Sequence, residues 1–189
     1  SKKVHIDIDP SSINKIIKVD LAIVGDVNEV LKSTIKKINQ KQNGIKVSNK
    51  QKISKWWEQI QKWREKDSLG FINSDKTIKP QHAVQRLYEL TKSQDTFITT
   101  EVGQHQMWAA QHYKFNKPNR WMTSGGLGTM GYGLPAAVGV QIAHPDKLVI
   151  DIAGEASVLM TMQEMSTAVQ YNLPIKIFVL NNQYMGMVR

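Results

Sequence analysis

The chain has 189 residues, of which 41% are hydrophobic and 22% charged, a composition that fits one or two folded domains and is too apolar for a disordered chain. It contains no cysteine, which excludes a disulfide scaffold, a thiolate zinc site and a cysteine nucleophile. Its longest apolar runs fall far short of the ~20 residues that cross a bilayer, so we expect no transmembrane helix and no membrane partner.

The net charge of +9 is concentrated in the first part of the chain. Residues 1–79 hold 17 Lys and Arg against 9 Asp and Glu, whereas residues 80–189 hold 8 against 7. The excess is nearly all lysine, scattered among Asn, Gln and Ile, without the clustered arginines and aromatic side chains typical of a nucleic-acid face. We therefore expect a solvated lysine-rich surface and no nucleic-acid partner.

The two ends of the chain predict a segment of a longer protein. The sequence does not begin with Met, has no apolar signal core, and ends just after an apolar stretch. We expect a cytoplasmic protein that continues beyond both ends.

Residues 1–40 combine strand and helix patterns. Apolar and polar residues alternate over 4–9 up to a proline, and residues 21–26 form a short buried-strand pattern that ends in Gly-Asp. Apolar residues then recur at helical spacing from residue 28. This order predicts the end of an α/β unit, with Asp7 and Asp26 at or near the strand ends.

Residues 41–79 are polar and irregular, and Pro80 marks their end. Trp56, Trp57, Ile60 and Trp63 are spaced to form one apolar face of a helix. The favoured interpretation is a connecting helix whose aromatic face packs onto a domain.

Residues 80–189 alternate regularly between helix and strand patterns. The last helix pattern opens with Thr161 and Glu164 at the spacing of a capping box, in which threonine is the N-cap residue. Strands that alternate with helices predict a mostly parallel sheet with helices on both faces. The expected helices cover 80–91, 107–113, 134–143 and 161–171, and the expected strands cover 95–100, 147–153 and 175–180.

Polar clusters follow three of these strands, at 101–105, 154–155 and 181–182. Ligands bind outside the carboxyl ends of parallel strands, and successive strands are often neighbours, so we expect Glu155 and Asn182 to lie side by side. A carboxylate oxygen and an amide oxygen suit Mg²⁺ that also holds a phosphate. Taken singly, Glu155 is also explained as a carboxylate at a helix start, and Asn182 as part of a turn.

The glycine-rich loop over 125–133 permits more than one interpretation. Gly126, Gly128 and Gly131 match the dinucleotide-binding fingerprint, with Asp151 20 residues later, but the fingerprint must follow a strand and residues 115–121 predict none. Glycines let a backbone approach a ligand closely. Met130 within the loop either fills a core or supports a ligand, and the sequence leaves both open.

Residues 101–189 resemble the diphosphate-binding domain of thiamin-diphosphate enzymes. That family's Gly-Asp-Gly and Asn-Asn signature appears here as Gly154-Glu155-Ala156 and, after one helix, Asn181-Asn182. Glutamate stands where the family usually has aspartate. Further stretches resemble more narrowly the catalytic subunit of the acetohydroxyacid synthase (acetolactate synthase) family; they cover 101–110, 125–135, 163–168 and 184–188.

The resemblance extends to the N-terminal part, where residues 4–26 are similar to the end of that family's central, Rossmann-like FAD-binding domain. It implies that 1–40 end this FAD domain, that 41–79 link the domains, and that 80–189 form a thiamin-diphosphate domain truncated at its C-terminus. FAD would be structural. Its implied contacts are Asp7, Ile8, Asp26 and Val27.

The resemblance also implies the roles of individual site residues. Glu155, Asn182 and the backbone carbonyl of Tyr184 would bind Mg²⁺. Met130 would hold the cofactor in a bent conformation and, with Gln104, serve catalysis, while the activating glutamate lies outside this chain, in a partner subunit. The implied thiamin-diphosphate contacts are Gln104, His105, Gly128, Met130, Gly154, Ala156, Ser157, Asn182, Tyr184, Met185, Gly186 and Met187.

The implied activity is decarboxylation of pyruvate and transfer of the two-carbon unit to a second 2-ketoacid, pyruvate or 2-ketobutyrate, in branched-chain amino-acid biosynthesis. The implied partners are further catalytic subunits, in a homodimer or tetramer, and a small regulatory subunit. One alternative is another thiamin-diphosphate-dependent 2-ketoacid decarboxylase or carboligase, which the run over 103–108 disfavours. A second is a nicotinamide-binding module.

Overall fold

The computed structural model describes residues 2–40 and 50–188, and the chain divides into two compact units, Ser1–Lys66 and Asp67–Arg189. Residues 41–49 of the predicted linker lie outside the described residues. The predicted boundaries at 40 and 79 stay predictions.

The first unit contains a two-stranded parallel sheet and two helices. β1 (Val4–Asp7) pairs with β2 (Leu21–Val24), a short 3₁₀ turn covers Pro10–Ser12, and α1 (Val27–Gln40) follows β2. The two strands and the helix predicted for 1–40 are therefore confirmed. The predicted burial of the second strand is wrong for this unit, because Leu21 and Val24 are each more than half exposed. The carboxyl ends of the two strands lie together, because Asp7 pairs with Val24.

The tryptophan-bearing segment forms α2 (Lys50–Glu65), as its apolar spacing predicts. The rings of Trp56 and Trp63 meet edge to face with centroids 5.5 Å apart. Each of Trp56, Trp57 and Trp63 leaves about half of its surface exposed. The packing of this face onto a domain stays a prediction.

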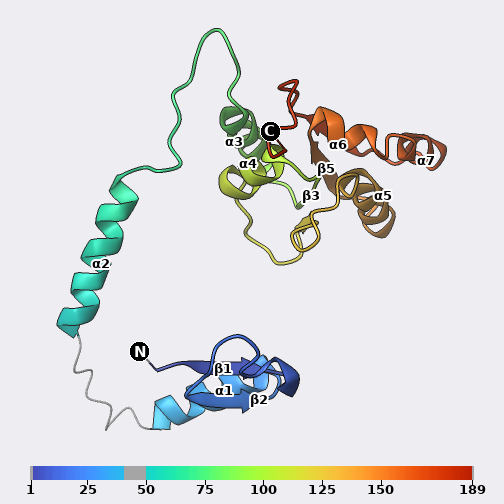
Figure 1. Cartoon of the computed structure of the whole chain (residues 1–189). Coiled ribbons are helices and arrows are strands. Elements are labelled where there is room, and N and C mark those ends of the chain that lie inside the picture. Colours follow the sequence, from blue (N-terminus) through green and yellow to red (C-terminus); the bar gives the residue numbers. More distant parts are fainter. Residues whose placement is uncertain (1, 41–49, 189) are drawn as a thin grey trace. The chain divides into compact units, whose positions relative to one another are not determined.

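The second unit is a four-stranded, all-parallel sheet with helices on both faces, as the sequence predicts (Figure 1). The strand order is β4-β3-β5-β6, which makes β5 and β6 neighbours. The elements are α3 (Pro80–Thr91), β3 (Thr96–Thr100), α4 (Gln104–His112), β4 (Trp121–Thr123), α5 (Gly133–Ala143), β5 (Leu148–Ala153), α6 (Glu155–Leu159), α7 (Glu164–Gln170) and β6 (Lys176–Val179).

Both faces of the central strands are buried, as is typical of parallel sheets. Ile98 and Ile150 pack with Val84 of α3 and Ala109 of α4 on one face. On the other face, residues of β3 and β5 pack against α5, with Phe97, Ala137 and Val149 at the centre. The central strands are thus fixed by hydrophobic packing, which holds their carboxyl ends at one rigid edge.

The predicted capping box at Thr161 is wrong. Helix α7 begins at Glu164, and its N-cap residue, Gln163, has helical backbone angles and makes no side-chain capping bond. The Thr161 hydroxyl instead donates to the carbonyl of Gly131, 30 residues away, at 3.1 Å. The side chain that the local pattern predicts as a helix cap therefore forms a tertiary hydrogen bond instead.

The expectation that no strand precedes the glycine loop is also wrong. β4 covers Trp121–Thr123 and pairs with β3, with Trp121 opposite Ile98. Three residues are too few to display strand alternation, so the pairing with β3 decides this element. Asp151, the acidic residue of the fingerprint, lies in the middle of β5 with a fully buried side chain, where it cannot meet a ribose.

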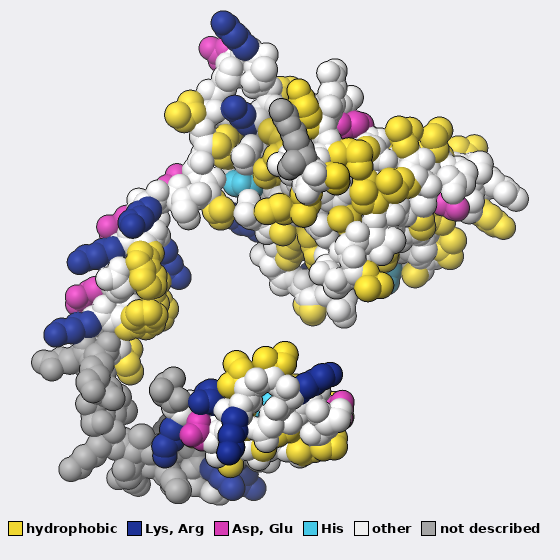
Figure 2. Space-filling view, in the orientation of Figure 1, with side chains coloured by type: hydrophobic (Ala, Val, Ile, Leu, Met, Phe, Trp, Pro, Cys, Tyr) yellow, Lys and Arg dark blue, Asp and Glu magenta, His cyan; other side chains and the backbone are white. Residues whose placement is uncertain are grey.

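The surface follows the charge distribution of the sequence. Figure 2 shows dark-blue lysine and arginine side chains gathered over the first unit, α2 included, and few over the second unit on this face. Within residues 2–40 and 50–188, no helix is both long and apolar enough to cross a membrane.

Candidate functional site

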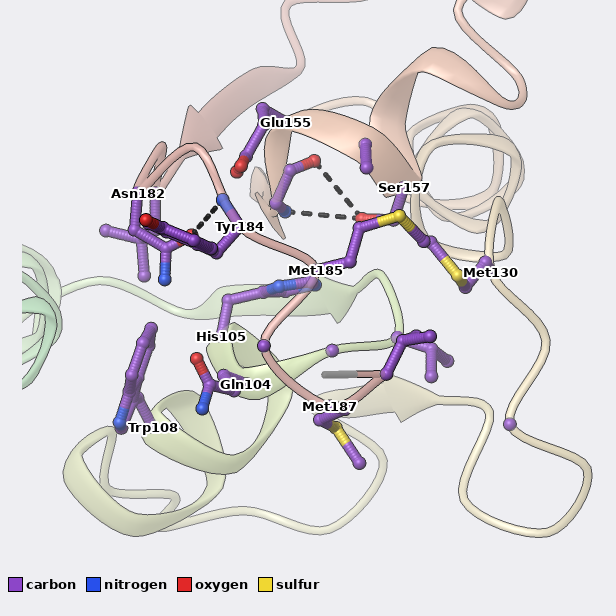
Figure 3. A pocket seen from close by; sticks show the side chains of 18 residues that line it. Gln104, His105, Trp108, Met130, Glu155, Ser157, Asn182, Tyr184, Met185 and Met187 are labelled. Atoms are coloured by element: carbon purple, nitrogen blue, oxygen red, sulfur yellow. Dashed lines mark hydrogen bonds between the residues drawn. The ribbon is translucent and has the colours of Figure 1, made fainter.

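The carboxyl ends of β3, β5 and β6 lie at one edge of the sheet. Thr100 pairs with Ile152, Ala153 pairs with Val179, and the amide of Leu180 donates to the carbonyl of Ala153 at 2.8 Å. Glu155 and Asn182 therefore follow neighbouring strands. Figure 3 shows them on the same side of one pocket, with Met130 on the opposite side.

This pocket has a volume of about 210 Å³, and all the residues predicted to contact thiamin diphosphate or Mg²⁺ line it. They come from the start of α4, the glycine loop, the start of α6 and the segment after β6. The sequence analysis missed five further lining residues. These are Val102, Gly103, Trp108, Leu180 and Val188. Trp108 was foreseeable, because it lies one helical turn after Gln104 and so shares its face of α4.

His105 is buried in the wall of the pocket between two glycines. A Cβ atom on Gly103 or Gly154 would lie 2.6 or 2.7 Å from atoms of the imidazole ring, so both positions require glycine for space. Burial lowers the pKa of His105 to about 4, and the ring is therefore neutral at pH 7. Its Nε2 has no hydrogen-bond partner within the described residues, which leaves it available to a ligand.

The C-terminal segment lies closely against the start of α4. A Cβ atom on Gly186 would lie 2.1 Å from Oε1 of Gln104, so the Gln104 side chain in its present position packs against the bare Cα of a glycine. Met185 and Met187 flank this glycine and line the pocket together with Gln104, and Figure 3 shows the Met185 side chain extending toward Met130. The three side chains give this wall a largely apolar surface with one amide.

Glu155 is the first residue of α6, a short helix that the sequence analysis did not predict. Ser157 stabilises this turn, because its hydroxyl accepts from the amide of Gly154 at 3.3 Å and donates to the carbonyl of Gly154 at 3.2 Å. The Glu155 side chain is half-buried. The interpretation of Glu155 as a carboxylate at a helix start is therefore confirmed, and its predicted role as a Mg²⁺ ligand stays a prediction, which its place in the pocket lining allows.

Oxygen atoms are the donors that this part of the pocket offers a metal ion. Oδ1 of Asn182 accepts from the amide of Tyr184 at 3.0 Å and keeps a second lone pair. The described residues contain no cluster of three or more His, Cys, Asp and Glu that could hold a metal. A site here would combine one carboxylate, one amide and a backbone carbonyl with oxygens of a ligand, a set that suits Mg²⁺.

Met130 lines the pocket, and it belongs to none of the core clusters of the described residues. Of the two interpretations that the sequence left open, this placement favours support of a ligand. The loop around it is ordered by hydrogen bonds, including one from the amide of Thr129 to Oγ of Ser124 at 3.0 Å.

The residues predicted to contact FAD lie in the first unit, around the carboxyl ends of β1 and β2. The amide of Gly25 donates to the carbonyl of Asp7 at 2.9 Å, which brings the two strand ends together. Oδ1 of Asp26 accepts from the amides of Asn28 and Glu29 and so caps α1. Local capping thus explains Asp26, and its contact with FAD, like those of Asp7, Ile8 and Val27, stays a prediction.

The comparisons with known proteins agree with this geometry. Residues 101–189 match the family described as thiamine pyrophosphate enzyme, C-terminal TPP binding domain. The chain is 46% identical over 185 residues to acetolactate synthase isozyme 3 large subunit of Escherichia coli K12, and the alignment covers 98% of this chain and 32% of that protein.

Two further relatives give the same result. The acetolactate synthase large subunit of Buchnera aphidicola subsp. Schlechtendalia chinensis is 49% identical over 186 residues, covering 98% of this chain and 32% of that protein. Acetolactate synthase 1, chloroplastic, of Nicotiana tabacum is 44% identical over 188 residues, covering 100% of this chain and 27% of that protein. The chain thus spans between about a quarter and a third of the length of these relatives.

Proposed function

The chain belongs to the acetolactate synthase large subunits, a family of thiamine pyrophosphate enzymes, and from this premise we propose that its pocket binds thiamin diphosphate together with Mg²⁺. One observation carries the proposal: residues expected from four separate stretches of sequence to contact this cofactor line a single pocket.

The charges of the pocket support a metal-bound diphosphate. None of the described residues that line it is lysine or arginine, and its one histidine is neutral at pH 7. A bound diphosphate would therefore be neutralised by a cation held by Glu155, Asn182 and the carbonyl of Tyr184. The apolar surface around Met130, Met185 and Met187 suits the rings of the cofactor.

The proposed reaction is that of acetolactate synthase, with pyruvate and either pyruvate or 2-ketobutyrate as substrates. Bound thiamin diphosphate would supply the carbon nucleophile that removes carbon dioxide from pyruvate and carries the remaining two-carbon unit. The residues of this chain bind and orient: Met130 supports the rings, Gln104 and His105 contact the cofactor, and the apolar wall excludes water. We place this reaction in branched-chain amino-acid biosynthesis.

Further parts of the proposal concern what lies around this site. The first unit would contribute to a structural FAD site through Asp7 and Asp26. Additional catalytic subunits, in a dimer or tetramer, and a small regulatory subunit are the proposed partners.

Binding of thiamin diphosphate with Mg²⁺ is expected to raise the unfolding midpoint of the protein by several degrees, because a ligand that binds only the folded state stabilises it. The measurement is a thermal shift on a subunit of the relatives' full length that carries this chain. Thiamin diphosphate with EDTA is the control and is expected to give a much smaller shift. A shift with NAD, and none with thiamin diphosphate and Mg²⁺, would contradict the proposal and favour a nicotinamide-binding module.

Met130→Ala is expected to lower kcat about 10- to 100-fold at saturating cofactor while changing cofactor affinity much less, since a misplaced reactant costs mainly rate. Steady-state acetolactate formation and calorimetric binding of thiamin diphosphate measure the two effects. Met162→Ala is the matched control, because Met162 is exposed and does not line the pocket. A collapse of affinity with kcat preserved would make Met130 an ordinary binding contact.

A further inference from the structure

Glu101 is a completely buried carboxylate that does not line the pocket. It directly follows β3, and its amide donates to the carbonyl of Ile152 at 3.2 Å. Among the side chains that the structure describes, at 2–40 and 53–188, no lysine, arginine or histidine forms an ion pair with it. A buried carboxylate is costly unless other donors satisfy it, so its partners indicate what it does.

The two carboxylate oxygens of Glu101 accept from two backbone amides, one near the end of the glycine loop and one in the first turn of α5. Oε2 accepts from Gly131 at 2.6 Å, and Oε1 accepts from Leu134 at 3.0 Å. Leu134 lies in the first turn of α5, a helix that has no side-chain cap of its own. Hydrogen bonds to a carboxylate are stronger than neutral ones, and a helix start favours the negative charge.

Thr161 holds the same glycine from its other side. Its hydroxyl donates to the carbonyl of Gly131 at 3.1 Å. Gly131 has a φ of +85°, a conformation that favours glycine, and a Cβ atom there would lie 3.0 Å from Cγ2 of Thr161, a tight approach. Two residues, each 30 positions away in sequence, thus hold the two polar groups of Gly131.

We propose that Glu101 and Thr161, together the Gly131 clamp, are positioning residues that fix Met130 in the pocket. The amide of Gly131 shares a planar peptide unit with the carbonyl and Cα of Met130, so an anchored amide also fixes where the Met130 side chain begins. This inference rests on the proposed function, because Met130 acts only through the cofactor that it supports.

Close packing of α5 against β3 explains why a glycine stands at position 133. A Cβ atom on Gly133 would lie 2.6 Å from the amide nitrogen of Glu101 and 2.3 Å from Oδ1 of Asp151. The start of α5 is therefore pressed directly against the end of β3. This close approach brings the amides of the loop within reach of Glu101.

Thr161→Val tests the clamp with little change in shape, because it replaces the hydroxyl by a methyl group. In a subunit of the relatives' full length, we expect amide hydrogen exchange over 124–134 to become about threefold or more faster without cofactor, since the loop loses an anchor. We expect kcat to fall about 3- to 10-fold, with thiamin diphosphate and Mg²⁺ affinities within about twofold. Thr161→Ser keeps the hydroxyl and should restore kcat.

Thr167→Val is the matched control. Its hydroxyl bonds only to Glu164 on its own helix, at 3.2 Å, and it does not line the pocket. It should leave exchange over 124–134 and kcat unchanged. Glu101→Gln, which sets an amide donor against a backbone amide, should give larger effects in the same direction; if it does not fold, Thr161→Val decides.

Unchanged loop exchange in Thr161→Val, or faster exchange with kcat unchanged, would overturn the clamp while leaving the proposed function standing. An equal effect of Thr167→Val would overturn it too, because the effect would then be general. If the wild-type subunit binds no thiamin diphosphate, the proposed function fails, and the positioning role fails with it. Thiamin diphosphate binding by the wild type therefore separates the two failures.

Discussion

Glu155→Gln is expected to raise the Mg²⁺ concentration needed for half-maximal thiamin diphosphate binding by about 100-fold or more. Loss of partners outside the coordination shell already costs roughly 10- to 100-fold in metal affinity, and a direct charged ligand should cost at least as much. The pocket has no lysine or arginine among its described lining residues, so no other cationic side chain there replaces the lost neutralisation. Mg²⁺ titrations by calorimetry or by activity measure the effect.

The competing explanation of Glu155 is a carboxylate that stabilises a helix start, and the chain offers a control for it. Glu164 is the first residue of α7 as Glu155 is of α6, but it does not line the pocket. Glu164→Gln should leave the Mg²⁺ requirement unchanged, whereas Glu155→Asp, which installs the residue usual in the family, should keep it near wild type. An unchanged requirement in Glu155→Gln would show that Glu155 is not a ligand.

Asp151→Asn is expected to stabilise the protein by up to about 4 kcal/mol at pH 8, since a pKa unit corresponds to ~1.4 kcal/mol. Burial raises the pKa of Asp151 to about 7, and the neighbouring Glu101 carboxylate raises it further. Oδ1 accepts from the Thr99 hydroxyl at 3.0 Å, but Oδ2 is buried without a partner among the described residues. Asparagine keeps the shape and the acceptor and removes the charge.

The raised pKa of Asp151 makes the stability of the protein depend on pH in a predictable direction. Between about pH 4 and pH 7 the folded protein keeps a proton on Asp151 that the unfolded chain has released, so this group's contribution to stability falls as pH rises. The lowered pKa of His105 has the opposite effect on stability. Between about pH 4 and pH 6.5 this histidine is protonated in the unfolded chain and neutral in the folded protein, so its contribution to stability rises with pH. The difference between Asp151→Asn and wild type isolates the first effect.

Urea unfolding at pH 5, 6, 7 and 8 measures this difference, which should grow with pH and level off above pH 7. Asp146→Asn is the control, because it removes an exposed carboxylate five residues earlier. It should give no comparable pH-dependent gain. A constant difference between Asp151→Asn and wild type across the range would mean that Asp151 is ionised in the folded protein throughout.

Much of this molecule follows from its sequence. The strands β3, β5 and β6 lie within the predicted strand ranges 95–100, 147–153 and 175–180, and α3 occupies the predicted residues 80–91. The order of strands and helices predicts the parallel sheet. Polar residues at strand ends predicted that Glu155 and Asn182 lie together, because a parallel sheet brings the carboxyl ends of its strands to one edge. The other pocket residues were predicted from the resemblance to thiamin-diphosphate enzymes.

The tertiary structure decided what depends on contacts between distant residues. The strand β4 forms through the pairing of its three residues with β3. The Thr161 hydroxyl donates to the carbonyl of Gly131 and therefore does not cap α7. Glu101 is in the sequence one polar residue among several at a strand end, and its burial is compensated by two amides, that of Gly131 in the glycine loop and that of Leu134 in α5. Periodicity and motif spacing report local backbone preference and the face a residue occupies, whereas a polar side chain's partner depends on which segments pack together. The sequence therefore determined where the site lies, and only the packed structure determined how its glycine loop is held.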